Sequence, residues 1–146
     1  MSQVMILPGE WHVRYNYAAG LTATRFFTVL KEEGRITATK CGACGLVMLP
    51  PRSYCERCFR EVADWVDIGQ EGTILASTVV TEPFEGLPDP PYALAYVQLD
   101  GADTAMLNFV RGLDLGDLEA ALRRLAIGNR VRVVLKPPAE RQGRVT

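Results

Sequence analysis

All four cysteines of this 146-residue sequence lie within one short stretch. They form two Cys-x-x-Cys pairs separated by ten residues: Cys41, Cys44, Cys55 and Cys58. Zinc favours four ligands in a tetrahedron, and each pair turns tightly enough to offer two sulfurs to one ion. Gly42 and Gly45 suit such a turn, because glycine tolerates a positive φ. The spacing predicts a four-cysteine Zn²⁺ site; the alternatives are a redox dithiol or four buried free thiols.

The predicted zinc is structural rather than catalytic. A catalytic zinc generally keeps three protein ligands and one open position for water, whereas four cysteines close the coordination shell. His12, the only histidine, is not needed as a ligand. Ser53, Ser77 and Thr78 are the other candidate nucleophiles, and no nearby motif supplies a base for them. We therefore predict no catalytic residues and no activity for the isolated chain.

The composition is typical of one packed domain, or of one domain with a small appendage. No apolar run approaches the roughly 20 residues of a membrane helix. The first residues show neither a basic leader nor a long apolar stretch, so we expect no secretory signal and a cytoplasmic protein without membrane contact. In a reducing compartment, paired cysteines are more often metal ligands than disulfides.

A short helix is expected before the cysteines. Ala23, Phe26, Phe27 and Leu30 recur at helical spacing, which predicts one apolar face. Thr22 or Thr24 is expected to cap the start and Gly34 to end the helix. So short a helix must dock on another element. Further upstream, residues 6–20 are aromatic and interrupted by Pro and Gly, which predicts an arm lying over a surface.

After the cysteines the apolar pattern changes to a period of two, which predicts strands at 72–82, 92–100 and 104–110. A helix should follow, with Asp114 or Asp117 as cap, Gly128 at its end and one apolar face. That face is predicted to contain Leu115, Leu118, Leu122 and Leu125. A last strand is predicted at 130–135. This order is typical of an OB-fold, a small Greek-key barrel.

The sequence as a whole resembles the zinc-ribbon plus OB-fold family of acyl-CoA-associated proteins. The resemblance is carried by residues 25–58, 72–80, 90–112 and 127–143. It implies a mainly β protein: an N-terminal arm and docking helix (1–35), a four-cysteine zinc ribbon (36–63) and an OB-fold domain (64–146). It also implies that the four cysteines are the metal ligands and that any chemistry resides in a partner.

Members of that family are non-catalytic accessory subunits that hold a complex together and help to enclose the CoA ester. Their partners are thiolases, hydroxymethylglutaryl-CoA synthases, acyl-CoA hydratases and retro-aldolases. Residues 7–20 are similar to members that accompany thiolases of aromatic degradation, such as the benzoylsuccinyl-CoA thiolase. The resemblance therefore implies a hetero-oligomer with a thiolase-like catalytic subunit, and a hydratase or retro-aldolase partner is the alternative.

One departure concerns the C-terminal end. Family members usually continue after residues 140–146 with another apolar strand, whereas this sequence stops at Thr146. The last barrel strand is either absent or reduced to the stub Val145–Thr146. An open sheet edge is prone to pair with another chain, so we expect a partner or a dimer mate to cover it.

Two further groups of residues are predicted to meet the partner and its substrate. Exposed aromatic and apolar residues are typical anchors of protein interfaces. The predicted anchors are Trp11, Tyr15, Tyr17, Phe26, Phe27, Phe84 and Leu87; the alternative is that the arm and helix cover this chain's own ribbon. Seven of the eight charged residues in 120–146 are basic. Of these, the tail residues predicted to meet CoA phosphates are Arg130, Arg132, Lys136 and Arg141.

A nucleic-acid-binding OB-fold is the rival hypothesis. Such barrels stack bases on exposed aromatic side chains, for which Tyr92, Tyr96 and Phe109 are candidates. However, residues 61–119 contain twelve acidic residues and only one basic residue, Arg111. A nucleic-acid groove needs continuous positive charge, so we expect no nucleic-acid partner.

Overall fold

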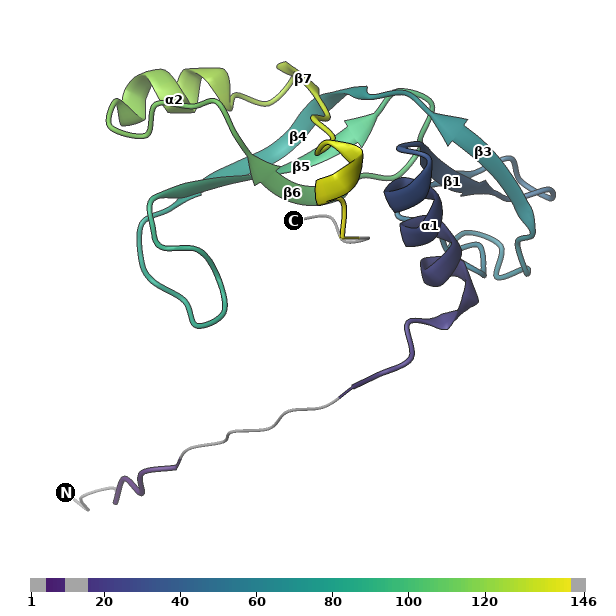
Figure 1. The fold of residues 1–146 in the computed structure, drawn as a ribbon, viewed down its shortest axis with the longest axis horizontal. Coiled ribbons are helices and arrows are strands. Elements are labelled where there is room, and N and C mark those ends of the chain that lie inside the picture. The colour runs from purple at the N-terminus through teal and green to yellow at the C-terminus, as the bar shows by residue number, and fades with distance from the viewer. Residues whose placement is uncertain (1–4, 10–15, 143–146) are drawn as a thin grey trace.

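The computed structural model describes residues 5–9 and 16–142, and Figure 1 shows their arrangement. The elements are α1 (Gly20–Glu32), β1 (Ile36–Lys40), β2 (Val47–Met48), β3 (Asp64–Ile68), β4 (Glu71–Val80), β5 (Tyr92–Leu99), β6 (Met106–Val110), α2 (Leu118–Arg124), β7 (Arg130–Arg132) and a 3-10 turn (Pro138–Glu140). The protein is mainly β, as predicted. In the described part of the chain, neither helix has the length and apolar character needed to cross a membrane.

The strands form two antiparallel sheets. The ribbon sheet has the order β2-β1-β3, and the larger sheet has the order β6-β5-β4-β7. β3 pairs with β1 along five residues, from Ile36 opposite Ile68 to Lys40 opposite Asp64. This pairing crosses the predicted boundary after residue 63, so the ribbon and the barrel share backbone hydrogen bonds.

Helix α1 docks on this chain. Phe26 is only 4% exposed and lies in a core with Ile36 and Ala38 of β1, Leu49 of the ribbon, and Ile68, Leu99 and Ala102 of the barrel segment. The predicted threonine caps are wrong, because the helix begins at Gly20 and Thr24 Oγ1 instead donates to the Gly20 carbonyl at 2.7 Å. Gly34 follows the helix end at φ +67°, as predicted.

The larger sheet is a curled half-barrel of the OB type. β4, β5 and β6 match the three predicted strands, although β6 begins at Met106 rather than at residue 104. β7 stops at Arg132 because its partner β4 begins at Glu71, directly opposite. β6 and β7 are therefore the edges of the sheet, and the described residues include no strand after β7. The predicted stub Val145–Thr146 lies outside the described residues.

The predicted leucine stripe of α2 is half right: Leu125 is buried against Ile74, Ala93 and Ala95 of the sheet, and Leu115 is partly buried beside them. Asp117 caps the helix by accepting from the Ala120 N–H at 2.9 Å, as one of the two predicted caps. Ala121 and Leu125 are buried, whereas Leu118 and Leu122 are about half exposed. The prediction is wrong for Leu118 and Leu122 only, and the helix spans Leu118 to Arg124 rather than reaching Gly128.

Candidate metal centre and its surroundings

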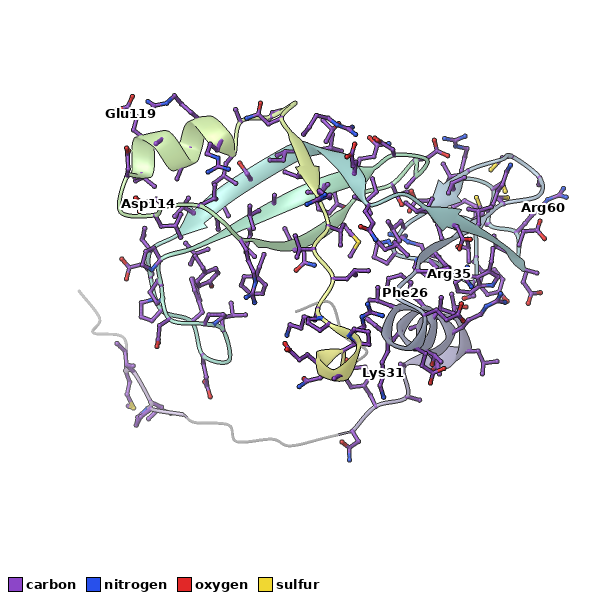
Figure 2. All side chains as sticks on the ribbon, turned by 45° about the horizontal axis from the view of Figure 1, so that its top comes forward. Phe26, Lys31, Arg35, Arg60, Asp114 and Glu119 are labelled. Carbon is purple, nitrogen blue, oxygen red and sulfur yellow. The ribbon has the colours of Figure 1, made fainter. Side chains whose placement is uncertain are left out.

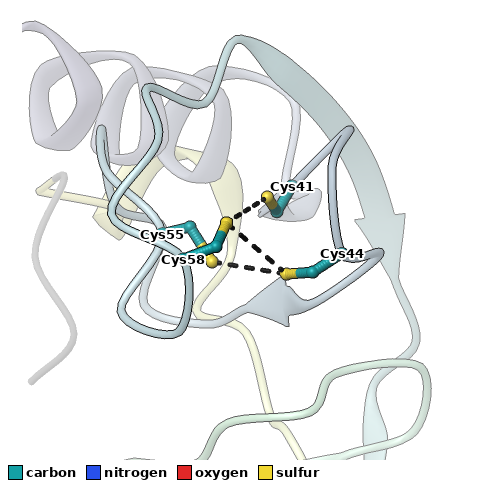
Figure 3. Close-up of side chains that lie close together, drawn as sticks. All are labelled: Cys41, Cys44, Cys55 and Cys58. Atoms are coloured by element: carbon teal, nitrogen blue, oxygen red, sulfur yellow. Dashed lines mark hydrogen bonds between the residues drawn. The ribbon is translucent and has the colours of Figure 1, made fainter.

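The four cysteine sulfurs converge on one point, as Figure 3 shows. The sulfurs of Cys41 and Cys58 are 3.4 Å apart, those of Cys44 and Cys55 are 3.5 Å apart, and those of Cys58 and Cys44 are 3.9 Å apart. All four lie within 4.8 Å of one another. Zn–S bonds of about 2.3 Å in a tetrahedron require S–S separations of about 3.8 Å. The donor set and its spacing therefore fit a zinc ion.

Two turns with the same backbone pattern carry these sulfurs; we call residues 41–46 the first knuckle and 55–60 the second knuckle. In the first, the Gly45 N–H donates to the Cys41 carbonyl at 2.8 Å. In the second, the Phe59 N–H donates to the Cys55 carbonyl at 2.9 Å. Each turn is closed by a second bond, from Cys41 N–H to Leu46 and from Cys55 N–H to Arg60. The knuckles are thus built alike despite different side chains.

Backbone N–H groups point at the sulfurs and favour their ionised form. The N–H groups of Cys44 and Ala43 lower the pKa of the Cys41 thiol to about 6. The N–H of Cys58, helped by that of Arg57, likewise lowers the pKa of the Cys55 thiol. Thiolates are the form that binds zinc, so each knuckle contributes one sulfur prepared for the metal.

The other sulfur of each knuckle is harder to ionise without a cation. The Arg60 N–H lowers the pKa of Cys58, but the neighbouring sulfurs, chiefly that of Cys41, and burial outweigh it and raise that pKa to about 12. The pKa of Cys44 is also raised, since burial and nearby sulfurs outweigh the Leu46 N–H. Four thiolates at these separations would repel one another, and a bound dication removes that repulsion.

Hydrogen bonds hold the segment after the first knuckle against the barrel. The Val47 N–H donates to Asp103 Oδ2 at 2.8 Å, and the Asp103 N–H donates to the Val47 carbonyl at 2.8 Å. The Thr104 hydroxyl accepts from the Leu49 N–H at 2.7 Å and donates to the Leu49 carbonyl at 2.9 Å. The loop between β5 and β6 therefore fixes the segment that follows the first knuckle.

No catalytic constellation is found among the described residues. The Ser77 hydroxyl donates to the Leu125 carbonyl at 2.8 Å, which gives it a structural role. A hollow of about 340 Å³ lies beside the first knuckle, lined by Cys41, Arg60 and Asp64 among others, and contains no nucleophile paired with a base. His12 lies outside the described residues.

The predicted partner-facing residues fall into three groups. Trp11 and Tyr15 lie outside the described residues. Tyr17, Phe84 and Leu87 are exposed. Phe84 and Leu87 lie on the loop between β4 and β5, which projects away from the sheet in Figure 1. The prediction is corrected for Phe26, which is buried in the core of this chain.

Phe27 also packs largely within this chain. It is partly buried, and its ring lies edge-on to that of Phe26 with centroids 5.2 Å apart. The aromatic residues of the helix therefore face the ribbon and barrel, whereas Leu21 at its start is exposed.

The predicted phosphate contacts do not gather into one basic surface. Arg130 Nη1 donates to Asp100 Oδ1 at 2.8 Å, and its Nη2 forms ion pairs with Asp100 and, at 3.6 Å, with Glu71. Arg130 is therefore already paired with this chain's own carboxylates, and its contact with CoA phosphate stays a prediction. Arg132 follows on the same face of β7 and is exposed.

The remaining two tail residues lie elsewhere. Arg141 Nε donates to the Lys136 carbonyl at 2.8 Å. The Arg141 guanidinium lies against Gly34, at the C-terminal end of α1, where a cation is favoured by the helix dipole. Figure 1 shows this tail beside α1, away from β7.

The three aromatic residues of the rival hypothesis do not form an exposed platform. Tyr92 is buried, and its ring packs against that of Phe109 with centroids 5.5 Å apart. Of the three, only Tyr96 is exposed. This arrangement disfavours base stacking on the sheet.

Comparison with known families agrees with the geometry. Residues 30–63 match the family described as "ChsH2, rubredoxin-like zinc ribbon domain", and residues 65–136 match "ChsH2, C-terminal OB-fold domain". The chain belongs to this family. Its ribbon is thus a zinc-ribbon domain whose four cysteines are able to bind a zinc ion. No curated protein matches the sequence.

Two solved structures share the fold. A chain described as "Ltp2-ChsH2(DUF35) aldolase" is 21% identical with a TM-score of 0.61, covering 84% of this chain and 92% of that one. A DUF35-family protein of unknown function from Sulfolobus solfataricus is 29% identical with a TM-score of 0.54, covering 64% of this chain and 70% of that one. Both similarities support the ribbon-plus-barrel architecture.

Sequence reasoning missed one residue of this region. Phe59 occupies the place in the second knuckle that Gly45 occupies in the first. A comparison of Cys-x-x-Cys-Gly with Cys-x-x-Cys-Phe would have found it, because the turn calls for a positive φ at that position.

Proposed function

We propose that this chain is a non-catalytic accessory subunit of an acyl-CoA-processing complex, and that its partner is a thiolase that cleaves or forms a C–C bond. The observation that carries the proposal is membership of both halves in the ChsH2 family. The solved structure described as an Ltp2-ChsH2 aldolase shares this fold, and its description names an aldolase beside ChsH2. This supports an accessory role. It also makes an aldolase the main alternative partner.

The geometry of the metal centre supports the absence of catalysis. Four sulfurs at tetrahedral spacing leave a zinc ion no open position for water or substrate. When bound, the ion supplies structural cross-linking of the two knuckles. Of the predicted anchors, Tyr17, Phe84 and Leu87 are exposed, and we assign them to the partner interface.

Copurification followed by an activity assay tests the proposal. The tagged full-length chain should retain an acyl-CoA-processing enzyme that mass spectrometry identifies as a thiolase. The isolated chain should show no thiolase, aldolase or hydratase turnover, and activity should depend on the retained enzyme. Recovery of an aldolase or a hydratase would correct the partner, whereas robust turnover by the isolated chain would overturn the accessory role.

A two-variant test separates the exposed loop from the tail. Phe84→Ala should weaken assembly by about 2 kcal/mol, the size of an interface hot spot, while the isolated chain stays folded. Arg132→Glu should leave assembly intact and raise the KM for the CoA substrate if this residue meets phosphate. An unchanged KM would leave Arg132 as a solvated residue.

A further inference from the structure

Phe59 has a backbone conformation that a phenylalanine rarely adopts. Its φ is +56°, the only positive φ found for a non-glycine residue in the described part of the chain. The equivalent residue of the first knuckle is Gly45, with φ +76°. A side chain in this left-handed region is disfavoured by contact between Cβ and the neighbouring carbonyl, so glycine is the residue that the turn itself prefers.

Packing within this chain does not explain the phenylalanine. The side chain is 81% exposed and belongs to none of the three hydrophobic clusters of the described residues. The zinc site does not need it either, because the first knuckle makes the same backbone bonds with glycine. Backbone strain of this kind clusters at binding and switch sites, and here it coincides with an exposed aromatic ring.

The second knuckle differs from the first at each outward position. The first offers the small residues Gly42, Ala43 and Gly45, whereas the second offers larger ones at the equivalent exposed positions. These are Glu56, Arg57 and Phe59, followed by Arg60, which replaces the buried Leu46. Figure 2 shows Arg60 at the ribbon end of the molecule, opposite the end that carries α2 and Glu119.

The charges beside Phe59 indicate the chemistry of its partner. Glu56 is paired with Arg52 at 2.8 Å, but Arg57 and Arg60 form no ion pair within the described residues. Arg60 follows Phe59 directly and Arg57 precedes it by two residues, and both are exposed. Donors that are covered without an acceptor are destabilising, and carboxylates are their strongest acceptors.

We propose that Phe59 is the anchor by which the second knuckle docks into an apolar pocket, rimmed by carboxylates, on the catalytic subunit of the complex. This inference rests on the proposed function and adds the contact residue and its complement. Tyr54, which is also exposed, begins the same hairpin through its bridge to Glu61, so the docking surface comprises residues 54–61.

Phe59→Gly tests the anchor because the two expected effects have opposite directions. Glycine relieves the backbone strain, so the zinc-loaded variant should unfold at the same or a higher temperature than the wild type. It also removes the ring, so the Kd for the copurified catalytic subunit should rise by roughly thirty-fold, as for an interface hot spot. Phe59→Tyr should restore binding. A mere structural role would predict lower stability and unchanged binding.

Two further variants serve as controls for the Phe59→Gly experiment. Ile127→Ala removes another exposed apolar side chain, near α2, and should leave the Kd unchanged. Arg57→Glu should raise the Kd by about tenfold and flatten its dependence on salt, with full zinc content. If Arg57 only offsets the charge of the zinc–thiolate centre, the variant will instead lose zinc and keep its Kd, which would overturn the charged rim.

The outcomes distinguish the two proposals. If no acyl-CoA enzyme binds the wild-type chain, the proposed function fails. If one binds and Phe59→Gly binds it equally well, the anchor fails while the function stands. Dimerisation of the isolated chain that depends on Phe59, measured by light scattering, together with unchanged binding to the enzyme would also overturn the anchor.

Discussion

The two zinc knuckles have the same backbone and opposite surroundings. In both, a Cys carbonyl accepts from the residue four positions later, and the turn closes on the residue after that. The first knuckle leads into Val47 and Leu49, which are hydrogen-bonded to the loop between β5 and β6. The second carries Phe59 into solvent. The two knuckles thus share a backbone and differ in their surroundings, which are the barrel for the first and solvent for the second.

This difference shows which residues the metal requires and which it does not. The metal and the turn require the cysteines and the N–H groups, which both knuckles provide. They do not require Phe59, since Gly45 performs the same role in the first knuckle. A residue type that occurs in only one knuckle is therefore explained by what that knuckle contacts, which is the barrel or a partner.

The largest expected effect is loss of the metal, which the two knuckles should share. Cys44→Ser and Cys58→Ser should each abolish stable zinc binding, because each removes one of four ligands. Structural zinc contributes roughly 10–16 kcal/mol in zinc-finger peptides, so the ribbon should unfold. Elemental analysis should give about one zinc per wild-type chain and almost none for either variant.

Thermal unfolding provides the second measurement of this effect. Chelation of the wild type should lower the melting temperature as strongly as either substitution. A zinc-free chain with unchanged stability would refute the structural metal. If Cys58→Ser alone were tolerated, the knuckles would not be equivalent and the comparison would fail.

The next effect should appear at the first knuckle alone. Thr104→Val removes the hydroxyl that bonds both the N–H and the carbonyl of Leu49. Because these groups are partly buried, the loss should cost about 1–3 kcal/mol of unfolding free energy. Hydrogen exchange should accelerate at Leu49, and an unchanged rate at Phe59 is the internal control.

Two substitutions, one that replaces a glycine and one that introduces a glycine, should then change the unfolding free energy differently in the two knuckles. Gly45→Ala places a Cβ at φ +76° and should destabilise the chain by about 1–2 kcal/mol. Phe59→Gly removes a Cβ at φ +56° and should not destabilise it. Denaturant titrations of the two zinc-loaded variants measure both; destabilisation by both would mean that the Phe59 ring supports the fold.

The smallest expected effect is on the pH dependence of stability. It involves Asp100, which lies beside the loop between β5 and β6. The hydrogen bond from Arg130 to Asp100, with the charge of Arg130, lowers the pKa of Asp100 below its ordinary value. The resulting stabilisation is fully present above the unfolded pKa of about 3.9 and is lost as pH falls through the folded pKa. Asp100→Asn should therefore flatten the acid limb of the stability curve. An identical acid limb would show that the pair contributes nothing.

The sequence by itself determined the local features of this protein. Two Cys-x-x-Cys pairs predict two sulfur-bearing turns, because such a turn depends on a few consecutive residues. Alternating apolar residues predicted β4, β5 and β6 to within two residues at every end, since a strand's own side chains must alternate between core and solvent. Asp117 was among the predicted caps for the same local reason.

Pairing between distant residues was decided only in the tertiary structure. β1 contains buried Thr37 and Thr39, so its burial cannot be inferred from polarity. Its partner β3 lies 24 residues or more away along the chain, and no local signal specifies that register. The ion pair of Arg130 with Asp100 likewise joins residues 30 positions apart. These contacts depend on how the chain closes on itself.

The burial of individual apolar side chains was likewise decided only in the tertiary structure. Phe26 and Phe84 are both aromatic, yet one is buried and the other exposed, because only Phe26 has a sheet beneath its helix. Leu122 of α2 and Leu125 directly after it are both leucines, yet only Leu125 packs against the sheet. Local patterns determine which elements form, whereas packing decides which of their side chains remain free to meet a partner.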